Sequence, residues 1–402
     1  MRFQNLSISW QIRSYGTRDT IQPGSPLRIL LDYRPALRQR TGVGEYVHEL
    51  ARALVATAAP GRPESLSLFS SSWQHRLAPD VVPGATVIDR RIPVRVLNLL
   101  WHRAGWPTVE RLTGGDFDVV HSAHPLRLPS NRAAQVVTVH DLDFLTHPER
   151  TTAEIRRDYP VLAPAHIRGA DAVAVVSQHT ASEVVRLTGV ARERIFVCPL
   201  GRPDWAPRDS EPANAPLLFL GSIEPRKNVG LLLDAYERLR ATRDARGVTT
   251  PRLILAGGAG LDSGPILSRA AAPPLAAHVT VLGYVAPEAR PSLYASAMAC
   301  ILPSHTEGFG LPALEAMTIG VPVVVADQGA LPEVVGTAGR LFHAGDADAL
   351  AAALDTVVSA ADDRLRMREA GLVQSRLFSW TNTAGRTREA WAHAVDRKAR
   401  RG

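Results

Sequence analysis

The chain has 402 residues, more than one ordinary core holds, and at about 150 residues per domain this length predicts two to three domains. Hydrophobic residues make up 45% and charged residues 21%, which is typical of a globular protein and excludes a disordered or fibrous one. The net charge of +7 favours an anionic partner: nucleic acid, an anionic lipid surface or a phosphorylated small molecule.

The two cysteines, Cys198 and Cys300, lie far apart, and neither has a cysteine or histidine at metal-ligand spacing. This argues against a disulfide framework and a structural zinc site, and it fits a reducing cytoplasm. No apolar run reaches the ~18 to 20 residues that span a bilayer. Residues 1–26 are polar and lack the apolar centre of a secretory signal, so we expect a loosely ordered extension there.

From residue 27 short apolar runs alternate with amphipathic segments. Strands are predicted at 28–31, 117–121, 135–139 and 172–176, and a helix is predicted to begin at Glu45, with its buried side at Tyr46, Val47, Leu50 and Leu54. Apolar strands separated by helices indicate a parallel sheet covered on both faces. The pattern breaks at residues 201–216, where four prolines stand among polar residues in a composition typical of a linker.

The alternation restarts after this linker. The expected elements are strands at 217–220, 252–256, 279–282, 299–302 and 321–326, and helices at about 228–240 and 312–319. The chain is therefore predicted to contain two similar α/β halves. Because open parallel sheets bind ligands at the carboxyl ends of their strands, we expect the site in the cleft between the halves.

The most informative segment is 304–315, Ser-His-Thr-Glu-Gly-Phe-Gly-Leu-Pro-Ala-Leu-Glu, which directly follows a predicted strand. Gly308 and Gly310 let the backbone approach a ligand, and the free N–H groups of the following helix favour phosphate. Glu307 and Glu315 flank this anion pocket, where carboxylates can accept hydrogen bonds from sugar hydroxyls. Each glutamate alone is better explained as exposed. The full pattern favours a binding site.

The spacing of Glu307 and Glu315, with Gly-Phe-Gly-Leu-Pro between them, resembles the E-x7-E signature of retaining glycosyltransferases of family 4 (group 1). The resemblance covers the chain from residue 27 onward. It implies the α/β GT-B fold, two Rossmann-like doubly wound parallel-sheet domains facing across a cleft. The implied units are an acceptor-binding domain at 27–205, a nucleotide-sugar-binding domain at 206–380 and, at 381–402, a helix that crosses back to the first domain.

The segment 221–228, Gly-Ser-Ile-Glu-Pro-Arg-Lys-Asn, resembles the family's diphosphate-binding loop. Arg226 and Lys227, at the mouth of a strand, supply the positive charge that a departing nucleoside diphosphate needs. Many members carry arginine where this chain has Ser222, and Arg226 is interpreted as its substitute. A solvated basic turn explains Arg226 equally well and Lys227 less well.

In the first half, Gly42 and Gly44 resemble the family's N-terminal glycine loop, which approaches the donor phosphate and the acceptor. Their spacing fails the dinucleotide fingerprint, so an NAD-dependent dehydrogenase is disfavoured. His140 ends a predicted strand, and similar segments in the family contact the donor sugar. Asp141 and Asp143 form a D-x-D pair, which binds a metal in single-Rossmann glycosyltransferases. The basic loop and the helix N-terminus already supply positive charge here, so no metal is expected.

The resemblance implies a role for each of these residues. His140, Lys227 and Glu307 are the catalytic candidates. Donor binding is predicted for Gly42, Gly44, Arg226, Lys227, Gly308, Phe309, Gly310, Leu311 and Glu315. Glu307 and His140 are expected to hold sugar hydroxyls and Glu315 the ribose, without an enzyme nucleophile, a metal or another cofactor.

Three further segments carry weaker signals. Residues 257–260 resemble a loop beside the nucleobase, and 329–333 recur in the family as packing near the helix. Residues 90–111 mix arginines with apolar side chains, a pattern that docks on anionic headgroups, although a helix packed on the sheet explains it about equally well. No zinc finger, helix-turn-helix or aromatic stacking motif accompanies the positive charge, so nucleic acid is disfavoured.

We therefore predict a cytoplasmic hexosyltransferase, peripheral on the inner face of the cell membrane. It moves a hexose, mannose being favoured, from GDP-mannose or a UDP-hexose to a hydroxyl of a glycan or lipid-linked acceptor, with retention of configuration, in cell-surface polysaccharide or glycolipid biosynthesis. The alternatives are a sugar-nucleotide epimerase of the same fold, a storage-polysaccharide synthase and a nucleic-acid-binding protein.

Overall fold

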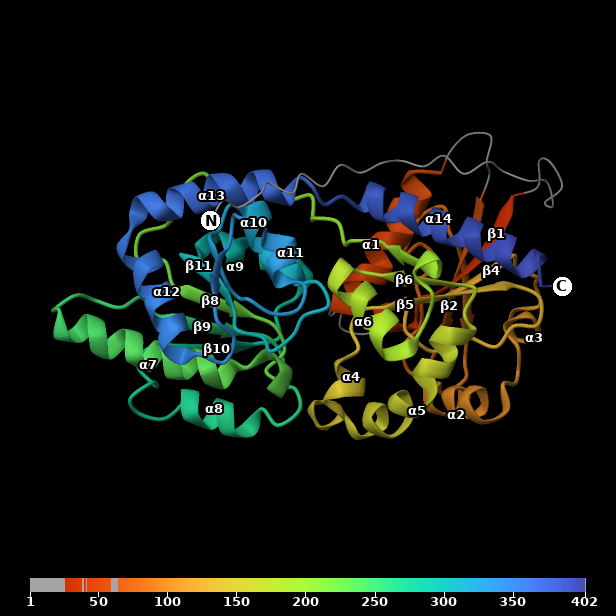
Figure 1. Cartoon of the computed structure of the whole chain (residues 1–402), viewed down its shortest axis with the longest axis horizontal. Coiled ribbons are helices and arrows are strands. Elements are labelled where there is room, and N and C mark those ends of the chain that lie inside the picture. Colours follow the sequence, from red (N-terminus) through yellow and green to blue (C-terminus); the bar gives the residue numbers. More distant parts are fainter. Residues whose placement is uncertain (1–25, 38–39, 41, 59–63, 402) are drawn as a thin grey trace.

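A computed structural model describes residues 26–37, 40, 42–58 and 64–401. The described chain forms two lobes that lie side by side along the long axis of the molecule (Figure 1). The expected extension at 1–26 lies, except for Pro26, outside the described residues.

Within the described part of the first lobe, seven strands form one sheet in the order β3-β2-β1-β4-β5-β6-β7, and each pairing is parallel. The strands are β1 (Leu27–Asp32), β2 (Glu64–Ser71), β3 (Thr86–Arg90), β4 (Val119–Ser122), β5 (Ala134–Val139), β6 (Ala172–Val175) and β7 (Ile195–Val197). Ile29 at the centre pairs with Leu66 on one side and Val119 on the other. The predicted strands omit β2, β3 and β7, although serines alternate with buried leucines in β2, which is the pattern of a strand.

Helices cover both faces of this sheet. They are α1 (Gly42–Ala56), α2 (Val94–Ala104), α3 (Val109–Thr113), α4 (Asp143–Thr146), α5 (Ala153–Gly169) and α6 (Gln178–Thr188), with short 3-10 turns η1 (Arg34–Ala36), η2 (Pro148–Arg150) and η3 (Arg192–Arg194). Helix α1 begins at Gly42, one turn before the predicted start. It buries Tyr46, Val47, Leu50 and Leu54, as their spacing predicts.

In the continuous stretch 64–401, the second lobe is a parallel sheet of six strands in the order β10-β9-β8-β11-β12-β13. Its strands are β8 (Leu217–Leu220), β9 (Leu253–Ala256), β10 (Val279–Gly283), β11 (Ala299–Leu302), β12 (Val323–Ala326) and β13 (Arg340–Phe342). Its helices are η4 (Pro225–Lys227), α7 (Val229–Ala245), α8 (Gly264–Ala270), η5 (Pro287–Ala289), α9 (Arg290–Ser296), α10 (Leu311–Ile319), α11 (Leu331–Val335), α12 (Ala347–Ser359) and α13 (Ala361–Ser375).

The described chain crosses between the lobes twice, and the two crossing segments contact each other. Residues 201–216 contain no helix or strand, and the N–H group of Arg202 donates to the carbonyl of Phe378, 3.2 Å away. A Cβ on Gly201 would lie 2.2 Å from the backbone nitrogen of Trp380, so the crossing fits only a glycine.

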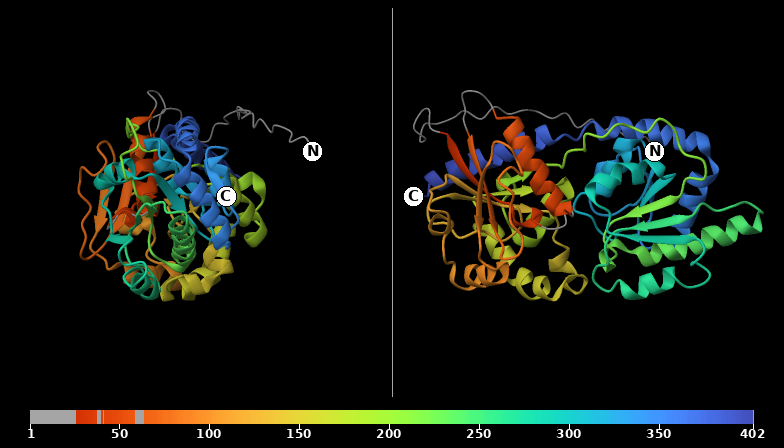
Figure 2. Two further views of the ribbon diagram at one scale, coloured as in Figure 1. Left: turned by 90° about the vertical axis from the view of Figure 1, so that its left-hand side faces the viewer. Right: turned by 180° about the vertical axis from the view of Figure 1, so that it is seen from behind.

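After the second crossing, α14 (Trp380–Ala399) returns to the first lobe. It packs on α1 and on β5, β6 and β7, and Trp391 is fully buried against that sheet. The right-hand view of Figure 2 shows the blue C-terminal helix running along the first lobe.

Candidate active site

Glu307 lies in the loop after β11 and is 6% exposed. One of its oxygens, Oε1, lies 2.5 Å from Lys227 Nζ and accepts from Ser304 Oγ at 2.7 Å, while Oε2 accepts from Arg226 at 3.2 Å. Burial alone raises the pKa of Glu307, but Lys227 and Arg226 outweigh it and lower that pKa to about 2. Glu307 is therefore a fixed carboxylate at neutral pH.

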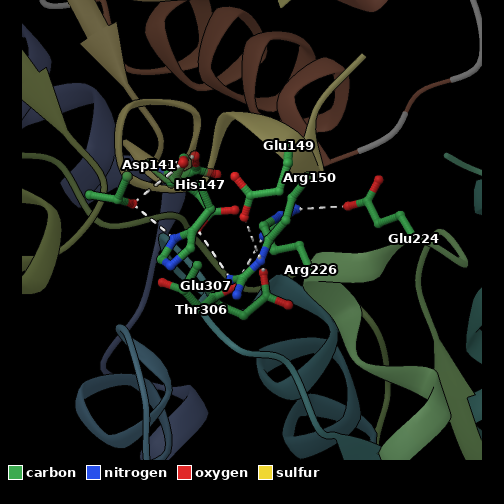
Figure 3. Close-up of polar contacts among 10 residues, drawn as sticks. Asp141, His147, Glu149, Arg150, Glu224, Arg226, Thr306 and Glu307 are labelled. Atoms are coloured by element: carbon green, nitrogen blue, oxygen red, sulfur yellow. Dashed lines mark hydrogen bonds and ion pairs between the residues drawn. The ribbon is translucent and has the colours of Figure 1, made fainter. Parts of the chain in front are cut away.

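Arg226 and Lys227 occupy η4, directly after β8, where Asn228 turns the chain into α7 with a positive φ of 52°. Arg226 also donates to Glu224 and to the Thr306 carbonyl, at 3.1 and 3.2 Å. Burial lowers the pKa of its guanidinium, but the neighbouring carboxylates, Glu307 first, outweigh this and raise it. Figure 3 shows Arg226 between Glu224 and Glu307, with side chains of the first lobe beside it.

The glycine loop after Glu307 is in direct contact with the first lobe. A Cβ on Gly308 would lie 1.7 Å from the carbonyl oxygen of His140, so only glycine allows the two backbones to approach. Gly310 has a φ of +101° and precedes α10, which begins at Leu311 and directs its first N–H groups toward this loop. Phe309 packs edge-to-face on Phe378, with ring centroids 5.6 Å apart. Its ring is therefore occupied, and only its backbone is available for the predicted contact with a nucleotide sugar.

His140 stands at the carboxyl end of β5. Its Nε2 lies 3.1 Å from the Ala123 carbonyl, which can only accept, so Nε2 carries the proton and Nδ1 is left as an acceptor. Burial lowers the pKa of His140 to about 4, and the imidazole is neutral at pH 7. The ring packs edge-to-face on Tyr46 of α1, with centroids 4.8 Å apart.

The two glycines predicted near the donor, Gly42 and Gly44, differ in the space around them. A Cβ on Gly44 would meet the Pro35 carbonyl at 2.8 Å, and one on Gly42 would meet no atom within 4 Å among those described.

Glu315 lies one turn into α10 and is 3% exposed. Its carboxylate accepts from the Tyr294 hydroxyl at 2.7 Å and from Arg290 at 3.4 Å. Burial raises the pKa of Glu315 to about 7, against the opposing effects of Arg290 and Tyr294. Arg290 also donates to the Arg40 carbonyl at 2.9 Å and lies 3.9 Å from Glu45, so it joins Glu315 to the first lobe.

The two aspartates of the D-x-D pair, Asp141 and Asp143, make their hydrogen bonds within the first lobe. Asp143 lies 3.0 Å from the Nδ1 atom of His147 and 3.7 Å from Arg150, and its N–H group donates to Asp141 at 3.2 Å. Burial raises the pKa of Asp143. Across the described residues, no cluster of three or more histidine, cysteine or acidic side chains is arranged to hold a metal ion.

The structure thus brings Glu307, Lys227 and Arg226 into one cluster, with Gly308 against the backbone of His140. Sequence reasoning missed Ser304, Arg290 and Tyr294, which fix the two glutamates. Ser304 stands within the recognised segment, three residues before Glu307, and could have been found there. Arg290 and Tyr294 come from α9, a short helix without a motif, and sequence alone offered no signal for them.

Solved structures share this arrangement of two lobes. Sucrose-phosphate synthase from Thermosynechococcus elongatus superposes with a TM-score of 0.71 at 20% identity, covering 90% of this chain and 98% of that one. WaaG, a glycosyltransferase involved in lipopolysaccharide biosynthesis, gives a TM-score of 0.64 at 15% identity over 90% and 98% of the two chains. The fold is therefore GT-B, as predicted.

Sequence comparison goes further than the fold. Residues 40–203 match the profile described as Glycosyltransferase Family 4, and residues 208–373 match Glycosyl transferases group 1. The O-antigen chain mannosyltransferase B of Escherichia coli is 33% identical over 91% of this chain and 99% of its own. The MMP alpha-(1->4)-mannosyltransferase of Mycolicibacterium hassiacum is 30% identical over 79% and 83%. The chain belongs to glycosyltransferase family 4, group 1, and is a glycosyltransferase, which confirms the resemblance read from the sequence.

None of the helices in the described ranges combines the length and the apolar character needed to cross a membrane.

Proposed function

We propose that this enzyme is a retaining hexosyltransferase that transfers a hexose, mannose being favoured, from a nucleotide-diphosphate sugar. GDP-mannose is the preferred candidate donor, and a UDP-hexose is the second. The observation that carries the proposal is the cluster of Glu307, Lys227 and Arg226 at the carboxyl ends of β8 and β11, beside the start of α10. Mannose is favoured because both relatives described above are named mannosyltransferases. A solved structure of this fold, Anabaena HepE, was obtained in complex with UDP and glucose.

Positive groups in the cluster suit a departing diphosphate. Lys227 has three N–H donors, and Glu307 accepts one, so donors remain for phosphate oxygens. The first N–H groups of α10 add partial positive charge at the same loop. As the bond between C1 and the phosphate oxygen breaks, negative charge develops on the diphosphate, where fixed cations and amides stabilise it. With this charge already in place, we propose that turnover needs no metal.

Glu307 and His140 have the protonation states that binding a sugar requires. Glu307 is ionised and already holds Lys227, so it acts as a hydrogen-bond acceptor rather than as a proton donor. His140 is neutral with a free Nδ1, a second acceptor for a sugar hydroxyl. Glu315 is proposed to hold the ribose. The acceptor oxygen bonds C1 on the face that the diphosphate leaves, and the departing phosphate oxygen takes the acceptor proton.

The proposed acceptor is a hydroxyl of a growing glycan or lipid-linked saccharide in cell-surface polysaccharide biosynthesis. The coverage of the O-antigen relative along nearly its whole length supports this choice. The deciding assay incubates the protein with GDP-mannose and a panel of UDP-hexoses, with mannose-terminated acceptors, with and without EDTA, and measures nucleoside diphosphate release and product anomer by NMR. We expect an α-linked product and EDTA-insensitive turnover. Conversion of donor without acceptor would instead indicate an epimerase.

We also propose that α2 rests on an anionic membrane surface and keeps the enzyme at the inner face of the cell membrane. Helix α2 buries Leu97 and Trp101, yet Val96 is 48% and Leu99 is 59% exposed, between exposed arginines at 95 and 103. Such a face combines apolar insertion with attraction to anionic headgroups. Sedimentation with vesicles containing phosphatidylglycerol tests this: the double substitution Leu99→Ser and Arg103→Ser should release the protein, and Val281→Ser on the opposite lobe should not.

A further inference from the structure

The N-terminus of α6, in the first lobe, is capped by a carboxylate from the second lobe. The N–H groups of Gln178 and His179 donate to Glu333 of α11, at 3.0 and 3.3 Å. The next N–H group, of Thr180, donates to Ser177 Oγ at 3.0 Å. The first three amides of the helix therefore all have acceptors, two of them on Glu333, and the negative charge lies at the positive end of the helix dipole. Figure 1 shows α6 and α11 on the facing sides of the two lobes.

The same helix turn makes a second bridge between the lobes. The Thr180 hydroxyl is buried, 3.2 Å from the carbonyl oxygen of His140 and 3.3 Å from that of Gly308. It accepts in turn from Ser177 Oγ at 3.0 Å. One hydroxyl thus lies between the backbone of His140, in the first lobe, and that of the residue after Glu307, in the second.

Glu333 is joined to Glu307 through the backbone of its own loop. The Ala330 N–H group donates to the Glu307 carbonyl at 2.9 Å. A Cβ on Gly329 would lie 2.7 Å from both the backbone nitrogen and oxygen of Glu307, so these two loops are in full contact. A shift of the α11 backbone relative to α6 should therefore also move the backbone that carries Glu307.

We propose that Glu333 and Thr180 are positioning residues that set the register of the two lobes and place His140 opposite Glu307. The inference rests on the proposed function, because it requires that His140 and Glu307 both bind the sugar. Glu333 is exposed while Thr180 is buried. The carboxylate cap can therefore break and re-form as the lobes open and close, and Thr180 aligns the backbones once they meet. Displacement of a reacting group by about 1 Å can slow turnover about 100-fold.

The first test compares Glu333→Ala with Glu333→Gln and with Glu369→Ala, an exposed glutamate on α13 of the same lobe. Most of the proposed groups that bind the nucleotide sugar lie on the second lobe, so the Kd of GDP-mannose should stay within about twofold while kcat falls about 10- to 50-fold in Glu333→Ala. Glu333→Gln keeps one acceptor oxygen and should recover part of this loss. Wild-type kcat in Glu333→Ala, or an equal loss in Glu369→Ala, overturns the proposal.

A second readout does not depend on turnover. Hydrogen exchange at the amides of Gln178 and His179 should be about tenfold faster in Glu333→Ala than in wild type, and unchanged in Glu369→Ala. Unchanged exchange in Glu333→Ala overturns the proposal even if wild type proves to use no nucleotide sugar. Failure of the proposed function would appear separately, as absence of transfer by the wild-type enzyme.

The third test isolates the Thr180 hydroxyl. Thr180→Val keeps the volume and removes the hydroxyl, whereas Thr180→Ser keeps the hydroxyl. We expect Thr180→Ser to retain most of kcat and Thr180→Val to lose about tenfold with an unchanged donor Kd. Equal losses in both variants would assign Thr180 to packing alone and overturn its positioning role.

Discussion

Glu307 and Glu315 are buried to a similar degree on one loop and helix, yet the structure gives them opposite protonation behaviour. Glu307 contacts two cations, and its pKa falls to about 2. Glu315 contacts one arginine at 3.4 Å and a tyrosine hydroxyl, and its pKa rises to about 7. Burial favours the neutral acid in both, so the number and proximity of cations decide the difference. The E-x7-E spacing therefore joins two unlike carboxyl groups.

The strongest way to break this contrast is Glu307→Gln, which removes the charge that Lys227 and Arg226 share. We expect the transfer rate to fall about 100- to 1000-fold, because the sugar loses an ionised acceptor and the cations lose their alignment. The free energy of unfolding should also fall, by about 2–3 kcal/mol, less than for a fully buried pair because both cations keep some exposure. Steady-state kinetics and urea unfolding measure the two effects. Unaltered rates would remove Glu307 from the site.

The second largest expected effect is on the pH dependence of the free energy of unfolding, which should differ in sign between the two glutamates. Glu315 has its pKa raised from 4.5 to about 7, so its stabilising contribution is present below about pH 4.5 and is lost as the pH rises through 7. Glu315→Gln should therefore become more stable than wild type across this window, by on the order of 3 kcal/mol. Glu307 has its pKa lowered from 4.5 to about 2, so its contribution is present above 4.5 and lost as the pH falls toward 2. The midpoints of urea unfolding, measured at intervals from pH 3 to 8, test both expectations. If variants at Glu307 and Glu315 changed the midpoint with the same pH dependence, the contrast between the two glutamates would be wrong.

Lys227→Ala weakens only one side of the Glu307 cluster. If Lys227 contacts the leaving diphosphate as proposed, the variant loses a charge-assisted contact of about 1.5–3 kcal/mol, and we expect the rate to fall roughly ten- to a hundredfold. Lys398→Ala, near the end of α14, is the matched control because it removes the same charge far from the loop. Near-normal turnover in Lys227→Ala would contradict the diphosphate role.

Glu315→Ala should act on binding rather than on chemistry. We expect the donor KM to rise about tenfold with kcat little changed, since a lost ribose contact affects ground and transition states alike. Titration with the nucleoside diphosphate alone provides the check. An unaltered affinity would count against the ribose role.

Tyr294→Phe is the mildest change in this series. It removes one hydrogen bond to Glu315, worth about 1 kcal/mol, and leaves the ring in its buried position. The donor KM should rise about two- to fivefold, less than in Glu315→Ala. A larger rise than in Glu315→Ala would mean that Tyr294 acts through something other than the carboxylate.

Much of the second lobe could be predicted because its signals are local. The strand before Glu307 and the helix after Gly310 follow from an apolar run, two glycines and a proline within a few residues. Glu307 and Lys227 could be named as candidates because a motif marks each, and the structure brings them into contact although 80 residues separate them.

The particular side-chain contacts between the lobes could not be predicted from the sequence. Glu333 stands in a segment interpreted as packing, but its carboxylate caps a helix that begins 155 residues earlier. Strand β2 was missed although the alternation of serine and leucine within it is the period-two pattern of a strand. The pKa of Glu315 depends first on burial, which raises it, and then on Arg290 and Tyr294, which oppose the rise; only the folded chain supplies all three.

The return of α14 has a consequence for synthesis. This helix covers β5, β6 and β7 and inserts Trp391 into the core of the first lobe, yet it follows the whole of the second lobe in the sequence. On the ribosome, the part of the first sheet that α14 covers, at β5, β6 and β7, therefore stays exposed until residues 380–399 have emerged. A fragment ending at the first crossing lacks this cover and should aggregate, so the two lobes mature as one unit rather than one after the other.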